Sequence, residues 1–231
     1  MLLLTDLKEQ LETLPKKRQL KILAGAMKKF GELVTQAGVT LKSSVDGASL
    51  AQSVFPDEDF SKVLTRIRQA AALAAKLKKR FAEDMPSVAK TASENDITRL
   101  GDHATAARAA LKEQWQQLLS ERIEPHKRLV QVVRDIPELA PQGGTKLGKL
   151  LDELGQQVSR VPTTQKEAKS IRASLDDLPQ VIQNLGLEGE VGEFLVEAAS
   201  GIGDPKKLYV PAIRTFFEQK KLWGLLRVKV R

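Results

Sequence analysis

Residues 95–139 read NDITRLGDHATAARAALKEQWQQLLSERIEPHKRLVQVVRDIPEL, and apolar residues recur along them at steps of three and four. Ile97, Leu100 and Trp115 belong to this series. The spacing places them on one face of a long helix, because an α-helix repeats every 3.6 residues. Pro125 removes a backbone donor, so a second, bent-away helix is expected to continue the apolar face after it. A stripe of this length needs partners, and it predicts that the remaining helices pack against it.

The composition favours a helical protein. Hydrophobic residues make up 42% of the 231 residues, enough for a sizeable core, whereas aromatic residues make up only 4%. Few aromatic residues together with many Ala and Leu suit helix-on-helix packing better than a β-sandwich or barrel. The chain has no cysteine, which excludes disulfides, thiolate zinc sites and cysteine nucleophiles and fits a reducing compartment. We expect a mainly α fold, a multi-helix antiparallel bundle.

The sequence predicts no membrane segment. No apolar run approaches the eighteen or so residues that a membrane span requires. The apolar residues 1–4 are followed at once by Asp6 and Lys8, and no basic segment precedes them, so they do not resemble a signal peptide. We therefore expect a cytoplasmic protein without a membrane partner.

Proline and glycine divide the first half of the chain into shorter predicted helices. A first helix is expected to stop at Pro15. A second follows it to form a helical hairpin, with an apolar stripe of Leu20, Leu23, Met27, Phe30 and Val34. Residues 38–54 are rich in Gly, Ser and Thr and predict a loop with at most one helical turn, at residues 48–54. Pro56 favours a helix start, and the helix over residues 57–83 is expected to run antiparallel to the one that begins near residue 95, with Trp115 buried between them.

The second half of the chain predicts shorter helices behind a linker at residues 141–145. Thr164 and Glu167 fit a capping box, and the helix that they begin is expected to end near Pro179. Gly186 is expected to close a short helical piece, and Gly201 to close a helix over residues 190–199. These breaks divide the chain into a helical bundle over 1–140, helical hairpins over 145–204 and a C-terminal segment over 205–231.

Positive charge is concentrated in the C-terminal segment. Residues 205–231 contain eight cations and one carboxylate, Glu218, and so hold +7 of the net charge of +8. A local cluster of cations suggests an acidic partner surface, for which nucleic acid is the commonest candidate. The predicted nucleic-acid contacts are Lys206, Lys207, Arg214, Lys220, Lys221, Arg227, Lys229 and Arg231.

The same segment is rich in aromatic residues and ends in a predicted strand over residues 225–230. No second strand of similar quality exists in the sequence, so this strand is expected to pair with a partner. The predicted partner contacts are Tyr209, Phe217, Trp223, Leu225, Val228 and Val230. The segment is thus expected to form a small basic helix-turn-helix-strand unit. The alternative is a docking tail whose aromatic residues form a core and whose cations face water.

Motifs for catalysis are incomplete. Residues 143–149 match the Gly-x-x-x-x-Gly-Lys part of a phosphate-binding loop, but Leu150 stands where Ser or Thr would hold Mg²⁺ and no strand precedes the motif. His103 and His126 are the only histidines, and neither has a ligand set at metal spacing. We expect no enzyme activity, no cofactor, no bound metal and no small-molecule substrate.

Three runs near the C-terminus, over residues 193–201, 210–217 and 221–230, resemble the C-terminal end of the very large helical ATPases of BREX-type phage-defence systems. The chain lacks the ATPase motor of that family. The resemblance therefore implies a tail region or a free-standing accessory protein built on the same end-module.

Together these observations predict a non-catalytic helical adaptor of a bacterial cytosolic, nucleic-acid-handling complex, with phage defence as the setting that the resemblance implies. It would bind duplex or single-stranded DNA, or a protein partner, through residues 205–231. One alternative is a protein-interaction scaffold without nucleic-acid contact. A cryptic hydrolase is a third possibility.

Overall fold

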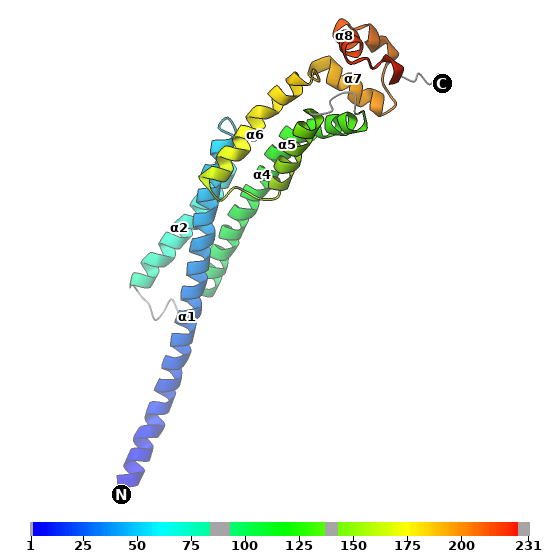
Figure 1. The fold of residues 1–231 in the computed structure, drawn as a ribbon. Helices are drawn as coiled ribbons and strands as arrows, with labels where there is room; N and C mark the ends of the chain where they lie inside the picture. Colours follow the sequence, from blue (N-terminus) through cyan, green and yellow to red (C-terminus); the bar gives the residue numbers. More distant parts are fainter. Residues whose placement is uncertain (1, 84–92, 137–142, 226–231) are drawn as a thin grey trace. The chain divides into compact units, whose positions relative to one another are not determined.

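The computed structural model describes residues 2–83, 93–136 and 143–225, which are largely helical and contain no strand (Figure 1). The prediction of a mainly α fold is confirmed. Of the strand predicted over 225–230, Leu225 instead ends the 3-10 turn η3 (Trp223–Leu225), and residues 226–230 lie outside the described residues. In the ranges described, no helix has both the length and the apolar character needed to cross a membrane.

The chain forms two compact units, each with its own core. One comprises Met1–Ser49 and Asp57–Leu111, and the other comprises Leu50–Pro56 and Lys112–Arg231. The predicted division near residues 140 and 204 stays a prediction.

The core of the first unit is built by three helices, α1 (Leu2–Val54), α2 (Ser61–Glu83) and the first part of α4 (Ser93–Asp135). Its buried cluster consists of small and branched side chains, which allow close helix packing: Ala37, Ala70, Leu77, Leu100 and Ala104. Arg80 near the end of α2 donates a hydrogen bond to Asp96 near the start of α4 at 2.9 Å. This pair joins opposite ends of the two helices, so α2 and α4 are antiparallel as predicted.

Helix α1 is one uninterrupted helix, so the predicted hairpin and the loop over residues 38–54 are both wrong. The hydroxyl groups that suggested a loop bond back into the helix. Ser44 is buried, and its Oγ donates to the Thr40 carbonyl oxygen at 2.8 Å. The Thr40 hydroxyl in turn donates to the Gln36 carbonyl oxygen at 3.0 Å. With its polar groups satisfied, the segment can bury Ala37, Ala48 and Ala51 on one face.

Three prolines that were predicted to end helices lie inside them. Pro15 lies in α1, Pro125 in α4 and Pro179 in α6 (Gln165–Asn184). An internal proline costs about 3 kcal/mol. In α4 and α6 the apolar residues that follow the proline offset this cost, since α4 buries Leu129, Val130, Val132 and Val133 and α6 buries Val181 and Ile182. Sequence reasoning weighed the local cost of Pro125 and Pro179 without this burial.

Helix starts are set by side-chain caps. Helix α2 begins at Ser61 instead of beside Pro56, because the Asp59 carboxylate accepts hydrogen bonds from the Ser61 amide at 2.7 Å and from its hydroxyl at 2.8 Å. These bonds lower the pKa of Asp59. Gly186 and Gly201 follow helix ends as predicted, with φ of +70° and +73°, a conformation that favours glycine, but the helix before Gly186 is α6 itself and not a separate short piece.

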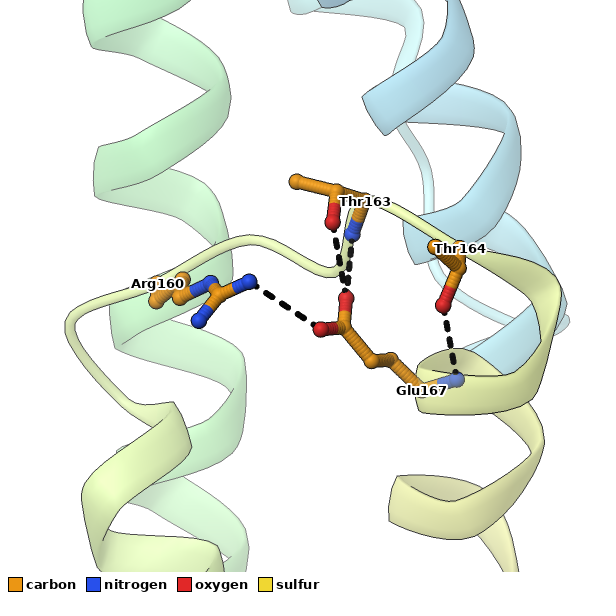
Figure 2. Close-up of polar contacts among 4 residues, drawn as sticks. All are labelled: Arg160, Thr163, Thr164 and Glu167. Carbon is orange, nitrogen blue, oxygen red and sulfur yellow. Dashed lines mark hydrogen bonds and ion pairs between the residues drawn. The ribbon is translucent and has the colours of Figure 1, made fainter.

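The cap of α6 has the predicted residues in a modified arrangement (Figure 2). The Thr164 hydroxyl accepts a hydrogen bond from the Glu167 amide at 3.2 Å, as a capping box requires. The Glu167 carboxylate, however, accepts from the amide and hydroxyl of Thr163 at 2.8 and 3.0 Å, one residue before the usual donor. Arg160 donates to the other carboxylate oxygen at 3.0 Å. These bonds, led by those from Thr163, lower the pKa of Glu167.

Trp115 is the centre of the second unit's core. Its side chain is fully buried, as predicted, and lies edge-on to Phe55 with ring centroids 5.5 Å apart. Its indole Nε1 donates a hydrogen bond to the Gln157 carbonyl oxygen at the end of α5 (Gly143–Gln157). Arg172 of α6 donates to the Ser53 carbonyl oxygen at 3.0 Å. The sequence predicted that the Trp115 ring packs against the helix over residues 57–83. It did not predict the contacts of Trp115 with Phe55 and Gln157.

Candidate nucleic-acid interface

The basic C-terminal segment is a series of short helical elements that follow α7 (Gly189–Ala199): η2 (Pro205–Tyr209), α8 (Pro211–Lys220) and η3. Pro205 and Pro211 stand at the starts of η2 and α8, where a proline has no helical hydrogen bond to lose. Asp204 caps η2 by accepting from the Lys206 amide at 2.9 Å. Helix α8 packs on both α7 and η2 (Figure 1). The predicted helix-turn-helix-strand unit is not supported, because the described part of the segment consists of two 3-10 turns and one α-helix, without a strand.

An aromatic cluster holds the segment together. Phe217 lies at its centre, with ring centroids 5.8 Å from Phe194 of α7, 6.1 Å from Phe216 and 5.6 Å from Trp223. Phe217 is buried, so its ring belongs to the core and cannot contact a partner in the folded protein. The core alternative therefore describes Phe217 and Phe216 correctly.

Two aromatic side chains remain at the surface. Tyr209 is 83% exposed and Trp223 is 42% exposed. Ile202, between α7 and η2, is 76% exposed and was not singled out in the sequence. Of the other predicted partner contacts, Leu225 ends η3, and Val228 and Val230 lie outside the described residues. Tyr209 and Trp223 are therefore the aromatic residues of this segment that are available for binding.

Helix α8 ends at Lys221, which adopts the left-handed conformation with φ of 55°. Its amide donates to the Glu218 carbonyl oxygen, and the Leu222 amide donates to Phe217 at 3.0 Å. This conformation costs a side-chain-bearing residue roughly 1–2 kcal/mol, which a glycine would not pay. The buried Leu222 side chain anchors the turn, and Lys221 itself is exposed.

Two of the predicted cations form ion pairs with carboxylates of the same chain. Lys207 Nζ donates to both oxygens of Glu197 on α7, at 2.7 and 2.8 Å, and this hydrogen bonding raises the pKa of Lys207. Arg214 donates to Glu218 one helical turn away at 2.9 Å. The Arg214–Glu218 spacing could have been recognised in the sequence as a stabilising i,i+4 pair. The Lys207–Glu197 pair depends on how η2 folds back on α7, which the sequence does not show.

Three other cations of the segment, Lys206, Lys220 and Lys221, form no ion pair with any residue in the described part of the chain. Lys206 and Lys221 are exposed and Lys220 is half-buried. The remaining predicted contacts, Arg227, Lys229 and Arg231, lie outside the described residues. Of the five predicted cations that the structure describes, three therefore have no carboxylate partner among the described residues.

Other candidate sites are weaker. The motif at residues 143–149 lies within α5, so it forms helix instead of a phosphate-binding loop after a strand. His126 is partly buried, which lowers its pKa, and across the residues described no cluster of three or more His, Asp or Glu could hold a metal ion. A cleft of about 190 Å³ between α5 and α6 is lined in part by Glu153, Gln157 and Glu167. The Glu167 carboxylate there is already bonded in the cap of α6.

Comparison with known proteins identifies no relative: no family model, no curated protein and no solved structure matches the chain.

Proposed function

We propose that this protein is a non-catalytic helical adaptor that binds nucleic acid through its C-terminal segment. The observation that carries the proposal is that Lys206, Lys220 and Lys221 lack carboxylate partners among the described residues, in a segment that also exposes Tyr209 and Trp223. Cations that are not neutralised within the protein can contact phosphates and release the counterions of the nucleic acid. The helical body would hold this segment within a bacterial cytosolic complex that handles nucleic acid.

The exposed aromatic rings favour single-stranded nucleic acid as the ligand. In a duplex the base faces are stacked and inaccessible, whereas in a single strand they can stack on an aromatic side chain, which contributes about 1–3 kcal/mol per base. Tyr209 is held at the end of η2 by the packing of that turn on α8, so its ring is presented by an ordered element. The resemblance of the last residues to BREX-type ATPases supports phage defence as the setting.

The Tyr209 side chain offers the sharpest test of this ligand. Because it is almost fully exposed, Tyr209→Ala should leave the unfolding midpoint unchanged while weakening the binding of a labelled single-stranded oligonucleotide by at least fivefold, about 1 kcal/mol, in fluorescence anisotropy. Ile202→Ala is the matched control, since it removes a similarly exposed side chain without a ring. Equal affinities for wild type and Tyr209→Ala would contradict a stacking role.

A scaffold that binds only protein is the second candidate, and exposed Ile202 is the observation in its favour. Ile202 is 76% exposed, and its aliphatic side chain can be buried by an apolar protein surface but cannot bind phosphate. Absence of affinity for both single-stranded and duplex DNA in the intact protein would favour this candidate.

A further inference from the structure

The N-terminal half of α1 carries an apolar face outside the core of its unit. Every described side chain from Arg18 to Gln36 is exposed or half-buried, and burial in the described part of α1 begins at Ala37. Leu20 and Ile22 are 64% and 66% exposed, which is unusual for large apolar side chains on an ordered helix. The described part of the protein therefore does not cover these apolar side chains.

This apolar face is broad. Successive residues of an α-helix are rotated by about 100°, so Leu20, Met27 and Val34, at steps of seven, lie close to one line along the helix. Ile22 and Leu33 lie on the opposite edge of the same face, and together the five residues cover a sector of about 160°. Leu33 is 41% exposed, and Met27 and Val34 are half-buried.

The rest of the circumference carries a net positive charge. Arg18, Lys21 and Lys28 are exposed and fall in the remaining sector, together with one exposed carboxylate, Glu32. The sequence around them, residues 15–31, has no carboxylate and six cations: Lys16, Lys17, Arg18, Lys21, Lys28 and Lys29. An apolar sector bordered by cations is the pattern of a helix that lies in the interface of a membrane.

We propose that residues 18–36 of α1 bind the surface of an anionic lipid membrane, with the apolar sector turned toward the acyl chains and the cations toward the headgroups. The net positive charge of this part of α1 favours an anionic occupant. It disfavours a second copy of the chain, which would bring six further cations close to the six already there. A single partner helix covers only a narrow seam, whereas a planar apolar phase covers a sector of 160°. The expectation of no membrane partner rested on the absence of a spanning segment, which attachment to the surface does not need.

Vesicle flotation with the full chain tests this proposal. The protein should float with vesicles of phosphatidylcholine containing roughly 30 mol% phosphatidylserine, and much less with pure phosphatidylcholine. Ile22→Glu places a carboxylate in the apolar sector and should abolish flotation. Lys21→Gln with Lys28→Gln should weaken partitioning by roughly 30-fold, because each cation near an anionic surface contributes about fivefold.

The matched control for Ile22→Glu is Val39→Glu. Val39 is 65% exposed on the same helix. It follows Lys21 by 18 residues, which is five full turns, so it lies on the same side of the helix as Lys21 and outside the apolar sector. Val39→Glu should float like the wild type, and so should Lys220→Gln with Lys221→Gln, which changes the C-terminal segment alone. Circular dichroism shows whether each variant remains folded.

Three results would overturn the proposal. One is a wild-type protein that does not float with anionic vesicles. Another is flotation that Ile22→Glu leaves unchanged or that the C-terminal variant abolishes. The third is a dimer in sedimentation velocity that Ile22→Glu dissociates, which would assign the face to a second copy of the chain.

Discussion

The indole Nε1 of Trp115 donates a hydrogen bond to the carbonyl oxygen of Gln157 at 2.9 Å. This bond joins α4 to the last residue of α5, and the Phe55 ring, just after α1, lies edge-on to the same indole. Trp115 is fully buried and its one polar atom is satisfied, which a buried tryptophan requires. A single side chain thus connects three segments that are far apart in the sequence, and it should dominate the stability of its unit.

Truncation of Trp115 is therefore expected to be severe. Trp115→Ala should lower the free energy of unfolding by about 3–5 kcal/mol, because it leaves a cavity against Phe55. Trp115→Phe keeps a ring but no donor, so it should cost less, with about 1 kcal/mol of its cost due to the lost hydrogen bond. Urea denaturation measures both variants. A cost near zero for Trp115→Ala would contradict this account of the core.

Two helical glycines should respond to alanine with opposite signs. A Cβ at Gly192 of α7 would overlap the Leu187 carbonyl oxygen, so Gly192→Ala must displace backbone and should cost about 1–3 kcal/mol. Gly101, in the interior of α4, has open space around the position of a Cβ. Gly101→Ala should stabilise by roughly 1 kcal/mol, the difference in helix propensity. Thermal unfolding distinguishes the signs, and a stabilised Gly192→Ala would show that α7 does not approach Leu187 so closely.

The cap of α6 should make stability depend on pH through Glu167. Its pKa is lowered from the ordinary value of 4.5 chiefly by the two hydrogen bonds from Thr163. A carboxylate with a lowered pKa in the folded state contributes stability that is complete above pH 4.5 and is lost as the pH falls through the folded value. Glu167→Gln should therefore lower the urea midpoint at neutral pH, and the gap to wild type should close well below pH 4.5.

Glu188 supplies the control for that experiment. It is the residue before α7, but its side chain makes no capping hydrogen bond. Glu188→Gln should leave the pH dependence of the urea midpoint as it is in the wild type. An identical response of the two variants would mean that the Thr163 bonds do not stabilise α6.

The sequence predicted helical character, the pairing of α2 with α4 and the helix ends at Gly186 and Gly201, because apolar periodicity and glycine conformation are local properties. It did not predict that α1 is continuous or that Pro125 and Pro179 lie within helices. Over residues 37–54 of α1 and after Pro125 and Pro179, tertiary burial outweighs a local preference, and hydroxyl groups such as that of Ser44 find acceptors inside the helix. Local rules identify where a helix is costly, but the compensation lies in residues distant in the sequence.

The candidate nucleic-acid interface, like the fold, could be predicted from the sequence only in part. The cations and aromatic residues of the C-terminal segment were visible in the composition. The composition did not show which of these side chains are free to contact a ligand. Lys207 is paired with Glu197 of α7, and Phe217 is buried against Phe194. Both partners belong to a helix outside the segment, and only the fold brings them together.

The dependence of DNA affinity on salt tests the central claim, binding through the C-terminal segment, most directly. Each phosphate contact contributes about 0.9 to the slope of log affinity against log salt for duplex DNA and about 0.7 for a single strand. Lys220→Gln with Lys221→Gln should flatten the slope by about 1 to 2 units. Lys146→Gln with Lys149→Gln removes the same charge from exposed positions of α5 and should leave the slope unchanged. Equal slopes for the wild type and the Lys220, Lys221 variant, or the same flattening in both variants, would contradict the claim.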